Sequence, residues 1–357
     1  MIYLNLFFSL NQFNPGIGSD KFFSQIFHRN RNERPIIGVL AQDIDTSNLV
    51  TMDYTKYNSY ISASYVKFLE SGGARVVPVL IDQPDDYYQM IFDSINGLLI
   101  PGGAQDFDNS GNVVLIQDCF RGLLLFSFLI ILFKISLLTL GFERAGKKML
   151  GMALKANDDG DYWPIWGTCL GFELLTFLAA NETHSLTRCS SMQQPLPLEV
   201  TSEFLGSKIG LDIPADVFTT LTTKNSTINF HNWCLSPKNF SYFEMDKFWN
   251  ILATNKDYND FEFISLLEAK KYPIWGSQFH PEKHAYEWTL HYPKIPHDVK
   301  SIHAGNYFAE FFVEETRKNG HKFVDRETEE KYLIYNYPAI FTGDIKTDET
   351  FVQSYFF

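Results

Sequence analysis

A strand–helix–strand pattern near the beginning of the chain constrains the fold more than any other feature of the sequence. Residues 35–40 and 75–80 are short apolar runs of the kind that form buried strands. Between them, apolar side chains recur at helical spacing from Tyr57 to Phe68, and Gly72-Gly73 ends this helix. A helix that joins two such strands makes them parallel neighbours with a right-handed crossover.

The same alternation of strands and helices continues along the chain. The further strands that we predict are 97–103, 163–166, 262–267 and 272–279, and the further helices are 85–95, a segment that starts at Leu170, and 301–318. We therefore predict an α/β fold, an open and mostly parallel sheet flanked by helices, in one domain that spans residues 34–323. Residues 324–357 are expected to form a tail that packs on this domain.

Composition limits what the chain can bind. Its 357 residues include 30 Lys and Arg against 42 Asp and Glu, which gives a net charge of −12. So acidic a chain is a poor candidate for gripping a phosphate backbone, and we expect no nucleic-acid partner. None of the four cysteines lies in a C-x-x-C pair, so neither a zinc ribbon nor a dithiol redox site is supported, and no metal is expected.

The first 33 residues do not follow the strand–helix alternation. Residues 2–10 are a short apolar run, but no Lys or Arg precedes it and no clear small-residue cleavage site follows. We interpret residues 1–33 as a disordered segment or a degenerate signal region.

A hydrophobic stretch around residues 112–150 is also anomalous. Residues 122–142 carry a single charge, Lys134, and hydropathy alone would make them a candidate membrane span. A span at this position would separate two loops that must meet at one site. In order of preference, the stretch is an insertion or a retained intron in the gene model, a buried helix, or a membrane span. A membrane association is therefore not expected.

A cysteine lies where a predicted strand becomes a helix, in the sequence Gly167-Thr-Cys169-Leu-Gly171. The flanking glycines allow a sharp turn, as in the nucleophile elbows of hydrolases. The partial positive charge of a helix N-terminus should favour the thiolate of Cys169 over the thiol. The motif alone is weak, and a small buried cysteine between glycines is the plain alternative.

A histidine and a glutamate follow the predicted strand 272–279. His280 would emerge at the carboxyl end of that strand, where open α/β sheets bind their ligands, and Glu282 could orient its imidazole. The alternatives are a surface or capping histidine, and a metal cluster of His280, Glu282 and His284. The metal cluster matches no strong ligand spacing.

A glycine turn, Pro101-Gly102-Gly103, ends another predicted strand. Its backbone could present an N–H group that, together with the N–H of Leu170, forms an oxyanion hole. The alternative is an ordinary turn. Three weak motifs, each at a strand end, make one stronger prediction of a cysteine-dependent acyl-transfer site.

These motifs in this order resemble the class I glutamine-amidotransferase-like fold, a flavodoxin-like sandwich, and most closely its γ-glutamyl hydrolase branch, which cleaves folate polyglutamates. The most specific pieces are W-P-I-W-G-T-C-L-G-F-E, N-F-H-N-W-C-L-S and Y-P-I-W-G-S-Q-F-H-P-E-K-H-A-Y-E-W. The resemblance covers nearly all of 34–357 except about 112–150. It implies hydrolysis of γ-glutamyl amides through a thioester, without a cofactor, on a small-molecule folyl or antifolate poly-γ-glutamate.

The resemblance also assigns roles to single residues. Cys169 is the nucleophile, His280 the general base and acid, and Glu282 the residue that orients His280, while Gly103 and Leu170 are the oxyanion donors. Glu173 and His231 match family positions near the substrate. For His231, packing beside Trp233 is an equally good interpretation.

Two competing functions stay open at this stage. An amidotransferase or glutaminase subunit would pass ammonia to a synthetase, but such relatives carry Gln where this chain has Glu173, and no synthetase domain follows. A non-catalytic isoform, damaged by the 112–150 stretch, is the other alternative.

The resemblance implies a lysosomal, vacuolar or extracellular protein. Three N-x-S/T sequons, at Asn181, Asn225 and Asn239, agree with glycosylation in such a compartment. Cys189 and Cys234 could pair there, although sequence alone does not show it. A homodimer is one option for the assembly.

Overall fold

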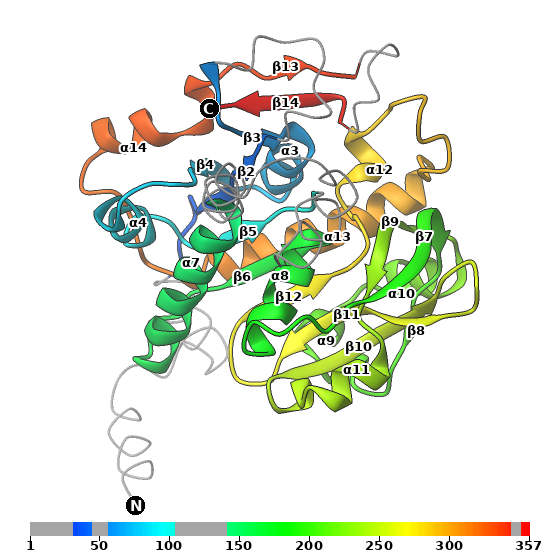
Figure 1. Cartoon of the computed structure of the whole chain (residues 1–357). Coiled ribbons are helices and arrows are strands. Elements are labelled where there is room, and N and C mark those ends of the chain that lie inside the picture. Colours follow the sequence, from blue (N-terminus) through cyan, green and yellow to red (C-terminus); the bar gives the residue numbers. More distant parts are fainter. Residues whose placement is uncertain (1–30, 45–55, 104–140, 344–350) are drawn as a thin grey trace, which may run out of the picture.

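A mostly parallel sheet forms the centre of the protein (Figure 1). The computed structural model describes residues 31–44, 56–103, 141–343 and 351–357. In this part of the chain the central sheet has eight strands in the order β4-β1-β5-β6-β12-β11-β10-β8. Their bounds are β4 (Arg75–Val79), β1 (Ile36–Leu40), β5 (Leu98–Ile100), β6 (Ile165–Thr168), β12 (Ile274–Ser277), β11 (Glu262–Ala269), β10 (Trp249–Lys256) and β8 (Glu199–Val200).

The sheet has a parallel and an antiparallel part. Neighbours from β4 to β12 pair in parallel, whereas β12, β11, β10 and β8 pair in antiparallel fashion. The parallel strands are short apolar runs because helices cover both of their faces, and all five residues of β1 are buried. The predicted fold class, an open and mostly parallel sheet flanked by helices, is confirmed.

Helices cover the two faces of this sheet (Figure 1). One buried apolar cluster contains residues of α4 (Asp85–Phe92), α7 (Gly141–Asp158) and α8 (Leu170–Ala179). The other contains residues of α3 (Ala63–Ser71), α10 (Ala215–Thr223) and α13 (Val299–Thr316). The strands between them contribute alternate side chains to each cluster, as the pleat requires.

The helix predicted from Tyr57 starts later than its spacing suggests. Residues Ser59–Ser62 form a strand, β3, and α3 begins only at Ala63. β3 pairs with the tail strand β14 (Gln353–Phe356), and Tyr60 lies opposite Phe356. This long-range pairing overrides the helical periodicity of the local sequence.

Helix α7 overlaps the anomalous hydrophobic stretch. It begins at Gly141, so residues 141–150 are its first turns, and Phe142, Ala145 and Met149 belong to the core. The remainder of the 112–150 stretch, and residues 1–30, lie outside the described residues. Within the described part of the chain, no helix is long and apolar enough to cross a membrane.

The C-terminal tail runs back over the domain. After α14 (Arg326–Tyr332), the strands β13 (Ile340–Phe341) and β14 join β3 and β2 (Gln42–Asp43) in a second sheet, in the order β13-β14-β3-β2. This sheet lies at the top of Figure 1.

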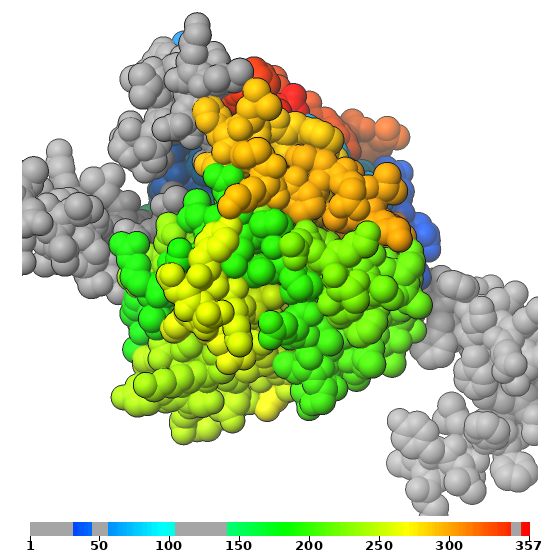
Figure 2. All heavy atoms as spheres, turned by 90° about the vertical axis from the view of Figure 1, so that its right-hand side faces the viewer, coloured from blue at the N-terminus to red at the C-terminus, as the bar shows by residue number. Residues whose placement is uncertain are grey.

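Two long strands, β7 and β9, form a separate two-stranded sheet. β7 (Thr187–Leu196) and β9 (Thr227–Cys234) pair in antiparallel register. Figure 2 shows the neighbouring face, on which the orange segment with α13 lies above the green and yellow segments, in agreement with the packing of α10 on α13. The short helices are α9 (Lys208–Leu211), α11 (Pro237–Tyr242) and α12 (Lys283–Tyr286).

Candidate active site

Cys169 lies on a sharp turn between β6 and α8. Its backbone φ is 50°, a value that only a few non-glycine residues adopt. The turn requires the two glycines beside it. A Cβ on Gly171 would lie 2.1 Å from the carbonyl oxygen of Ile100, and one on Gly167 would lie 2.6 Å from the carbonyl oxygen of Gly171. The sequence thus forms a nucleophile elbow, because no side chain fits at either flank.

The Cys169 thiol is protonated at rest, contrary to the thiolate expected at a helix N-terminus. The residue is 4% exposed, and burial, together with the charges of Glu173 and Glu282, raises the pKa of the Cys169 thiol well above its ordinary value. Lys283 and the backbone N–H of Leu170 lower this pKa, but they do not outweigh burial. A base must therefore take the proton when the sulfur attacks.

His280 supplies such a base. It follows β12, is 3% exposed, and its Nδ1 lies 2.7 Å from Oε1 of the buried Glu282. Burial lowers the pKa of His280, so the imidazole is neutral at neutral pH. Because Nδ1–H donates to Glu282, the lone pair of the imidazole is at Nε2, ready to accept a proton.

Cys169 and His280 both lie beside Gly102. A Cβ on Gly102 would lie 2.7 Å from Cε1 of His280 and 3.0 Å from Cβ of Cys169. β6 and β12 are parallel neighbours in the sheet, and Ser277 pairs with Thr168 at their carboxyl ends. This register carries both chemically active residues to the same edge of the sheet.

Tyr65 joins the glycine turn to the His280–Glu282 pair, and the sequence did not single it out. Its hydroxyl accepts a hydrogen bond from the N–H of Gly102 at 2.9 Å and lies 3.4 Å from His280 Nδ1. Burial, then the charges of Glu282 and Cys169, raise the pKa of Tyr65, so it stays a neutral hydroxyl. In the sequence, the signal for Tyr65 is its place on the buried face of the helix that became α3.

The predicted oxyanion donors are Gly103, in the turn after β5, and Leu170, the first residue of α8. The N–H of Gly102 is occupied by Tyr65, and Gln42 Nε2 donates to the carbonyl of Gly102 at 2.7 Å. A Cβ on Gly103 would lie 1.8 Å from Oε1 of Gln42, so a larger residue here would displace the Gln42 side chain. The roles of Gly103 and Leu170 stay predictions.

Comparison with known proteins identifies the family. Residues 35–110 match the model of Peptidase C26, and residues 138–294 match that of Glutamine amidotransferase class-I. γ-Glutamyl hydrolase of Homo sapiens is 40% identical over 331 residues, which are 92% of each chain. The chain belongs to the γ-glutamyl hydrolase family.

More distant members of the γ-glutamyl hydrolase family extend the comparison. γ-Glutamyl hydrolase B of Dictyostelium discoideum is 38% identical and covers 87% of this chain and 80% of its own. γ-Glutamyl hydrolase 1 of Arabidopsis thaliana is 30% identical over 88% of this chain and 80% of its own. The family resemblance expected from the motifs is confirmed.

Glu173 lies one helical turn beyond Cys169, and its N–H donates to the Cys169 carbonyl. Its carboxylate accepts a hydrogen bond from Nε2 of Gln278 at 2.9 Å, two residues before His280. In this member of the γ-glutamyl hydrolase family, Glu173 thus ties α8 to the loop that carries the imidazole. A contact with substrate stays a prediction.

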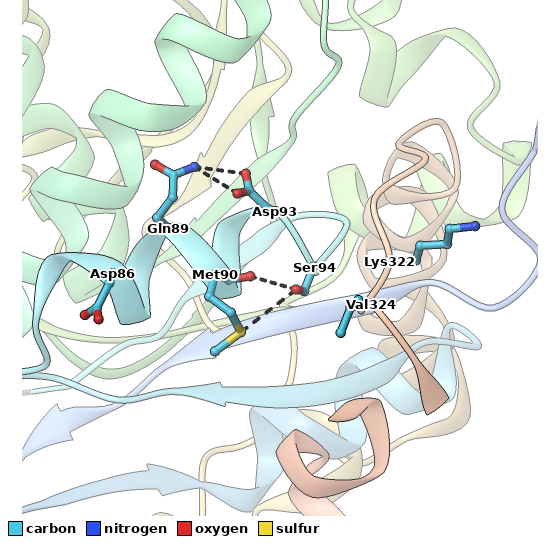
Figure 3. A pocket seen from close by; sticks show the side chains of 7 residues that line it. All are labelled: Asp86, Gln89, Met90, Asp93, Ser94, Lys322 and Val324. Carbon is cyan, nitrogen blue, oxygen red and sulfur yellow. Dashed lines mark hydrogen bonds between the residues drawn. The ribbon is translucent and has the colours of Figure 1, made fainter. Parts of the chain in front are cut away.

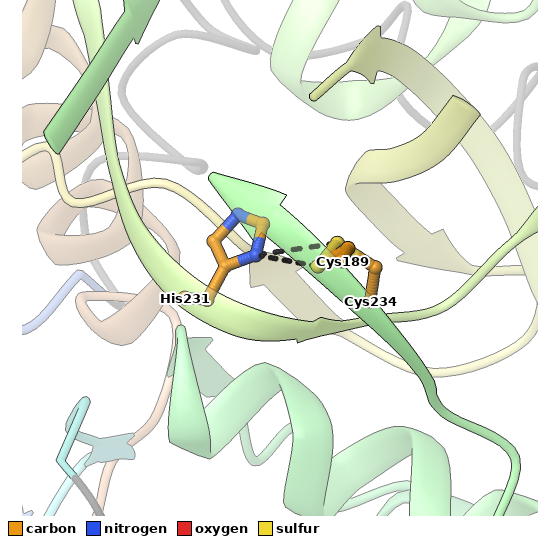
Figure 4. Close-up of side chains that lie close together, drawn as sticks. All are labelled: Cys189, His231 and Cys234. Carbon is orange, nitrogen blue, oxygen red and sulfur yellow. Dashed lines mark hydrogen bonds between the residues drawn. A yellow bond between two sulfur atoms is a disulfide. The ribbon is translucent and has the colours of Figure 1, made fainter. Parts of the chain in front are cut away.

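His231 lies beside a disulfide. Cys189 and Cys234 are bonded, and His231 Nδ1 lies 3.3 Å from Cys234 Sγ and 3.6 Å from Cys189 Sγ (Figure 4). Its other nitrogen faces Asn229 Oδ1 at 3.1 Å. The imidazole packs edge-on against Phe263.

Among the described residues, Cys189, His231 and Cys234 are a group whose side-chain atoms lie close enough together, within 4.8 Å of one another, to suggest a metal site. A disulfide offers no thiolates, so the oxidised pair is not a zinc ligand set. Burial lowers the pKa of His231 to about 3, so the imidazole is neutral. His284, the other metal candidate, has Nδ1 3.0 Å from the carbonyl oxygen of Pro296.

The three sequons differ in their accessibility. Asn181 and Asn225 are exposed. Asn239 Nδ2, in contrast, donates to the carbonyl of Ser185 at 2.6 Å and to Thr187 Oγ1 at 3.0 Å. The amide nitrogen that would carry the sugar at Asn239 is thus engaged in the folded chain, and glycosylation there stays a prediction.

A surface pocket beside α4 shares no residue with the site around Cys169 (Figure 3). It is lined by Asp86, Gln89, Met90, Asp93, Ser94, Lys322 and Val324. Gln89 Nε2 donates to the carboxylate of Asp93. The pocket lacks a nucleophile paired with a base.

Proposed function

We propose that this chain is a cysteine-dependent γ-glutamyl hydrolase that cleaves γ-glutamyl amide bonds. The membership of the family and the buried set of Cys169, His280 and Glu282 support the proposal. The observation that carries it is that Cβ of Cys169 and the imidazole of His280 both lie beside Gly102.

The reaction starts from a neutral thiol at Cys169 and a neutral imidazole at His280. Nε2 of His280 takes the thiol proton as Cys169 Sγ attacks the γ-carbonyl carbon, and the oxyanion is held by the N–H groups of Leu170 and Gly103. The C–N bond then breaks, and His280 returns the proton to the leaving amine. Water attacks the resulting thioester with His280 as base, which releases the glutamyl product and the thiol.

We further propose that the substrate is a folyl or antifolate poly-γ-glutamate. The names of the relatives state only γ-glutamyl hydrolysis, and the folate part comes from the family resemblance of the motifs.

Mass spectrometry of products from a defined folate polyglutamate tests the function. The native chain should release glutamate or shorter γ-glutamyl peptides, and Cys169→Ala should reduce turnover by about 10⁴-fold or more. Thr219→Ala is the control, since it shortens an exposed side chain on α10, outside the site. Turnover that survives in Cys169→Ala would contradict the proposal. Release of ammonia from glutamine in place of these products would favour the amidotransferase alternative.

We also propose that the protein works in a lysosomal, vacuolar or extracellular compartment. The Cys189–Cys234 disulfide and the exposed sequons at Asn181 and Asn225 support an oxidising, glycosylating route. Treatment of the native protein with an N-glycosidase should raise its gel mobility. Asn181→Gln and Asn225→Gln should each remove part of this shift, whereas a protein that shows no shift would contradict glycosylation.

A further inference from the structure

Gln42 is a buried amide that lies against the glycine turn of the site. The residue is 0% exposed, and its Nε2 donates to the carbonyl oxygen of Gly102, which is 60 positions away in sequence, at 2.7 Å. Its Oε1 lies 3.5 Å from the hydroxyl of Tyr60, which donates to it. Since a carbonyl oxygen can only accept, the amide nitrogen must be the atom that faces Gly102. The reaction steps described above give this side chain no role.

The second sheet places Gln42 at the turn. In this sheet, Gln42 of β2 pairs with Tyr60 of β3, and Tyr60 pairs on its other side with Phe356 of the tail strand β14 (Figure 1). The amide therefore comes from outside the central sheet, which carries Cys169 and His280 at the ends of its strands. The C-terminal tail thus supports the strand whose side chain holds the turn.

The contact with Gln42 fixes the direction of one backbone N–H group. The peptide unit between Gly102 and Gly103 is planar and trans, so its C=O and its N–H point in opposite directions. In a trans unit, the Cα of Gly103 lies on the same edge as the C=O of Gly102. Gln42 occupies this edge, because a Cβ on Gly103 would lie 1.8 Å from its Oε1. The N–H of Gly103 therefore points away from Gln42.

A second hydrogen bond holds the peptide unit on the other side of Gly102. The N–H of Gly102 donates to the hydroxyl of Tyr65 at 2.9 Å and is therefore engaged. Gly102 itself lies beside the nucleophile, since a Cβ there would be 3.0 Å from Cβ of Cys169. Of the two glycine N–H groups, the one that can serve an oxyanion is thus that of Gly103, which agrees with its predicted role.

We propose that Gln42 is a positioning residue for the oxyanion hole. By holding the carbonyl of Gly102, it keeps the N–H of Gly103 aimed at the oxygen of the tetrahedral intermediate. This inference rests on the proposed function and adds a residue that touches no reacting atom. A donor that is already oriented needs no reorganisation when negative charge develops. Without the amide, the turn is free to rotate, because glycine adopts many backbone conformations.

Substitutions of Gln42 in the full chain test this role by kinetics. Gln42→Leu keeps the size of the side chain but removes the donor, and kcat should fall by about 10–100-fold with little change in KM. Gln89→Leu removes an exposed amide on α4 and is the matched control, which should keep the native kcat. In Gln42→Glu, only the protonated carboxyl can donate to Gly102. The kcat of this variant relative to the native enzyme should therefore recover as the pH falls.

A γ-aldehyde analogue of the glutamyl residue reports on the hole without turnover. Cys169 Sγ bonds to the aldehyde carbon, and the thiol proton passes to the aldehyde oxygen, so the adduct resembles the tetrahedral intermediate. Affinity for this aldehyde should fall in Gln42→Leu by about the same factor as kcat. Affinity for a folate polyglutamate, measured by calorimetry in the Cys169→Ala background, should be the same with and without Gln42→Leu.

Each outcome separates the positioning role from the proposed function. A kcat of Gln42→Leu within about twofold of the native value would overturn the role, as would native affinity for the aldehyde in a variant whose kcat has fallen. If Gln42→Leu does not fold, Gln42→Glu decides, and a deficit that is equal at every pH would overturn the role. A native chain that hydrolyses no γ-glutamyl amide, but whose affinity for the aldehyde depends on Gln42, would contradict the proposed function alone.

Discussion

The two sides of the site are held in place by different forces. The side that carries Cys169 is fixed by backbone geometry, since β5, β6 and β12 lie in parallel register and glycines alone fit around the elbow. The side formed by β7 and β9 is an antiparallel pair with register shifts, and it is held by the Cys189–Cys234 disulfide. The nucleophile thus lies on the side where the backbone leaves no room for larger residues. The disulfide-linked side, β7 and β9, forms part of its surroundings.

The largest effect should come from the residue that orients the base. Glu282→Gln keeps the shape of the side chain but replaces the carboxylate with a neutral amide, whose NH2 group can donate to Nδ1 and so favour the other tautomer of His280. By analogy with the loss of a triad carboxylate, kcat should fall by about 10⁴-fold. Steady-state kinetics, with circular dichroism to confirm the fold, provides the measurement. A variant within tenfold of the native rate would place Glu282 outside the mechanism.

Adding one methyl group at the elbow around Cys169 should destabilise the fold. Gly171→Ala places a Cβ against the backbone oxygen of Ile100, and the free energy of unfolding should fall by about 3 kcal/mol or more. Gly151→Ala, in α7, meets no atom within 4 Å and should stabilise the protein by about 0.5–1 kcal/mol. Urea denaturation of both variants measures the contrast, and equal stabilities would show that the elbow is not tightly packed.

On the side formed by β7 and β9, we expect loss of the disulfide to lower the stability of the protein. Replacing Cys189 and Cys234 with alanine removes a cross-link between residues 45 apart in sequence, and should cost about 2–4 kcal/mol of unfolding free energy. Thermal unfolding of the double variant, with and without a reductant, checks this. If the double variant lost activity as completely as Glu282→Gln while staying folded, the division between the two sides would be wrong.

The pH profile should sharpen the assignment of the base. His280 must be neutral to accept the thiol proton, and burial lowers its pKa below the ordinary value near 6.5. The neutral form is therefore present above the lowered pKa, so kcat/KM should persist below pH 6.5 and fall only at more acidic pH. A profile of kcat/KM that declines with a midpoint above 6.5 would contradict a neutral buried imidazole.

The smallest effect should be at the engaged sequon. Asn239→Ala removes two hydrogen bonds that join α11 to the start of β7, and the unfolding free energy should fall by about 1–2 kcal/mol. The glycosylation pattern should not change. Loss of a glycan from Asn239→Ala, seen by mass spectrometry of the intact protein, would contradict the structure at this position.

Much of the fold and the centre of the site could be predicted from the sequence. Short apolar runs locate β1, β4, β5 and β12, and the Gly-x-Cys-x-Gly spacing gives the elbow because it encodes a local backbone requirement. The proximity of Cys169 and His280 followed from parallel strands whose carboxyl ends share an edge.

The remainder depends on contacts that no local pattern carries. β3 forms because Ser59–Ser62 pairs with a strand near the other end of the chain. The protonated state of Cys169 follows from burial and from two carboxylates on different elements, which outweigh the helix N-terminus. Lys283 looks like one more surface lysine in sequence, and only the packing of Phe230 and Phe351 shows that it is enclosed.

The protonated resting sulfur has a pharmacological consequence. Reagents that depend on a preformed thiolate, such as simple haloacetamides, should modify this cysteine slowly in the free enzyme. Electrophiles with the shape of the substrate would recruit the neighbouring imidazole during attack and should inactivate far faster. Selectivity over other cysteine hydrolases can thus be sought in mimicry of the substrate, with a mildly reactive warhead.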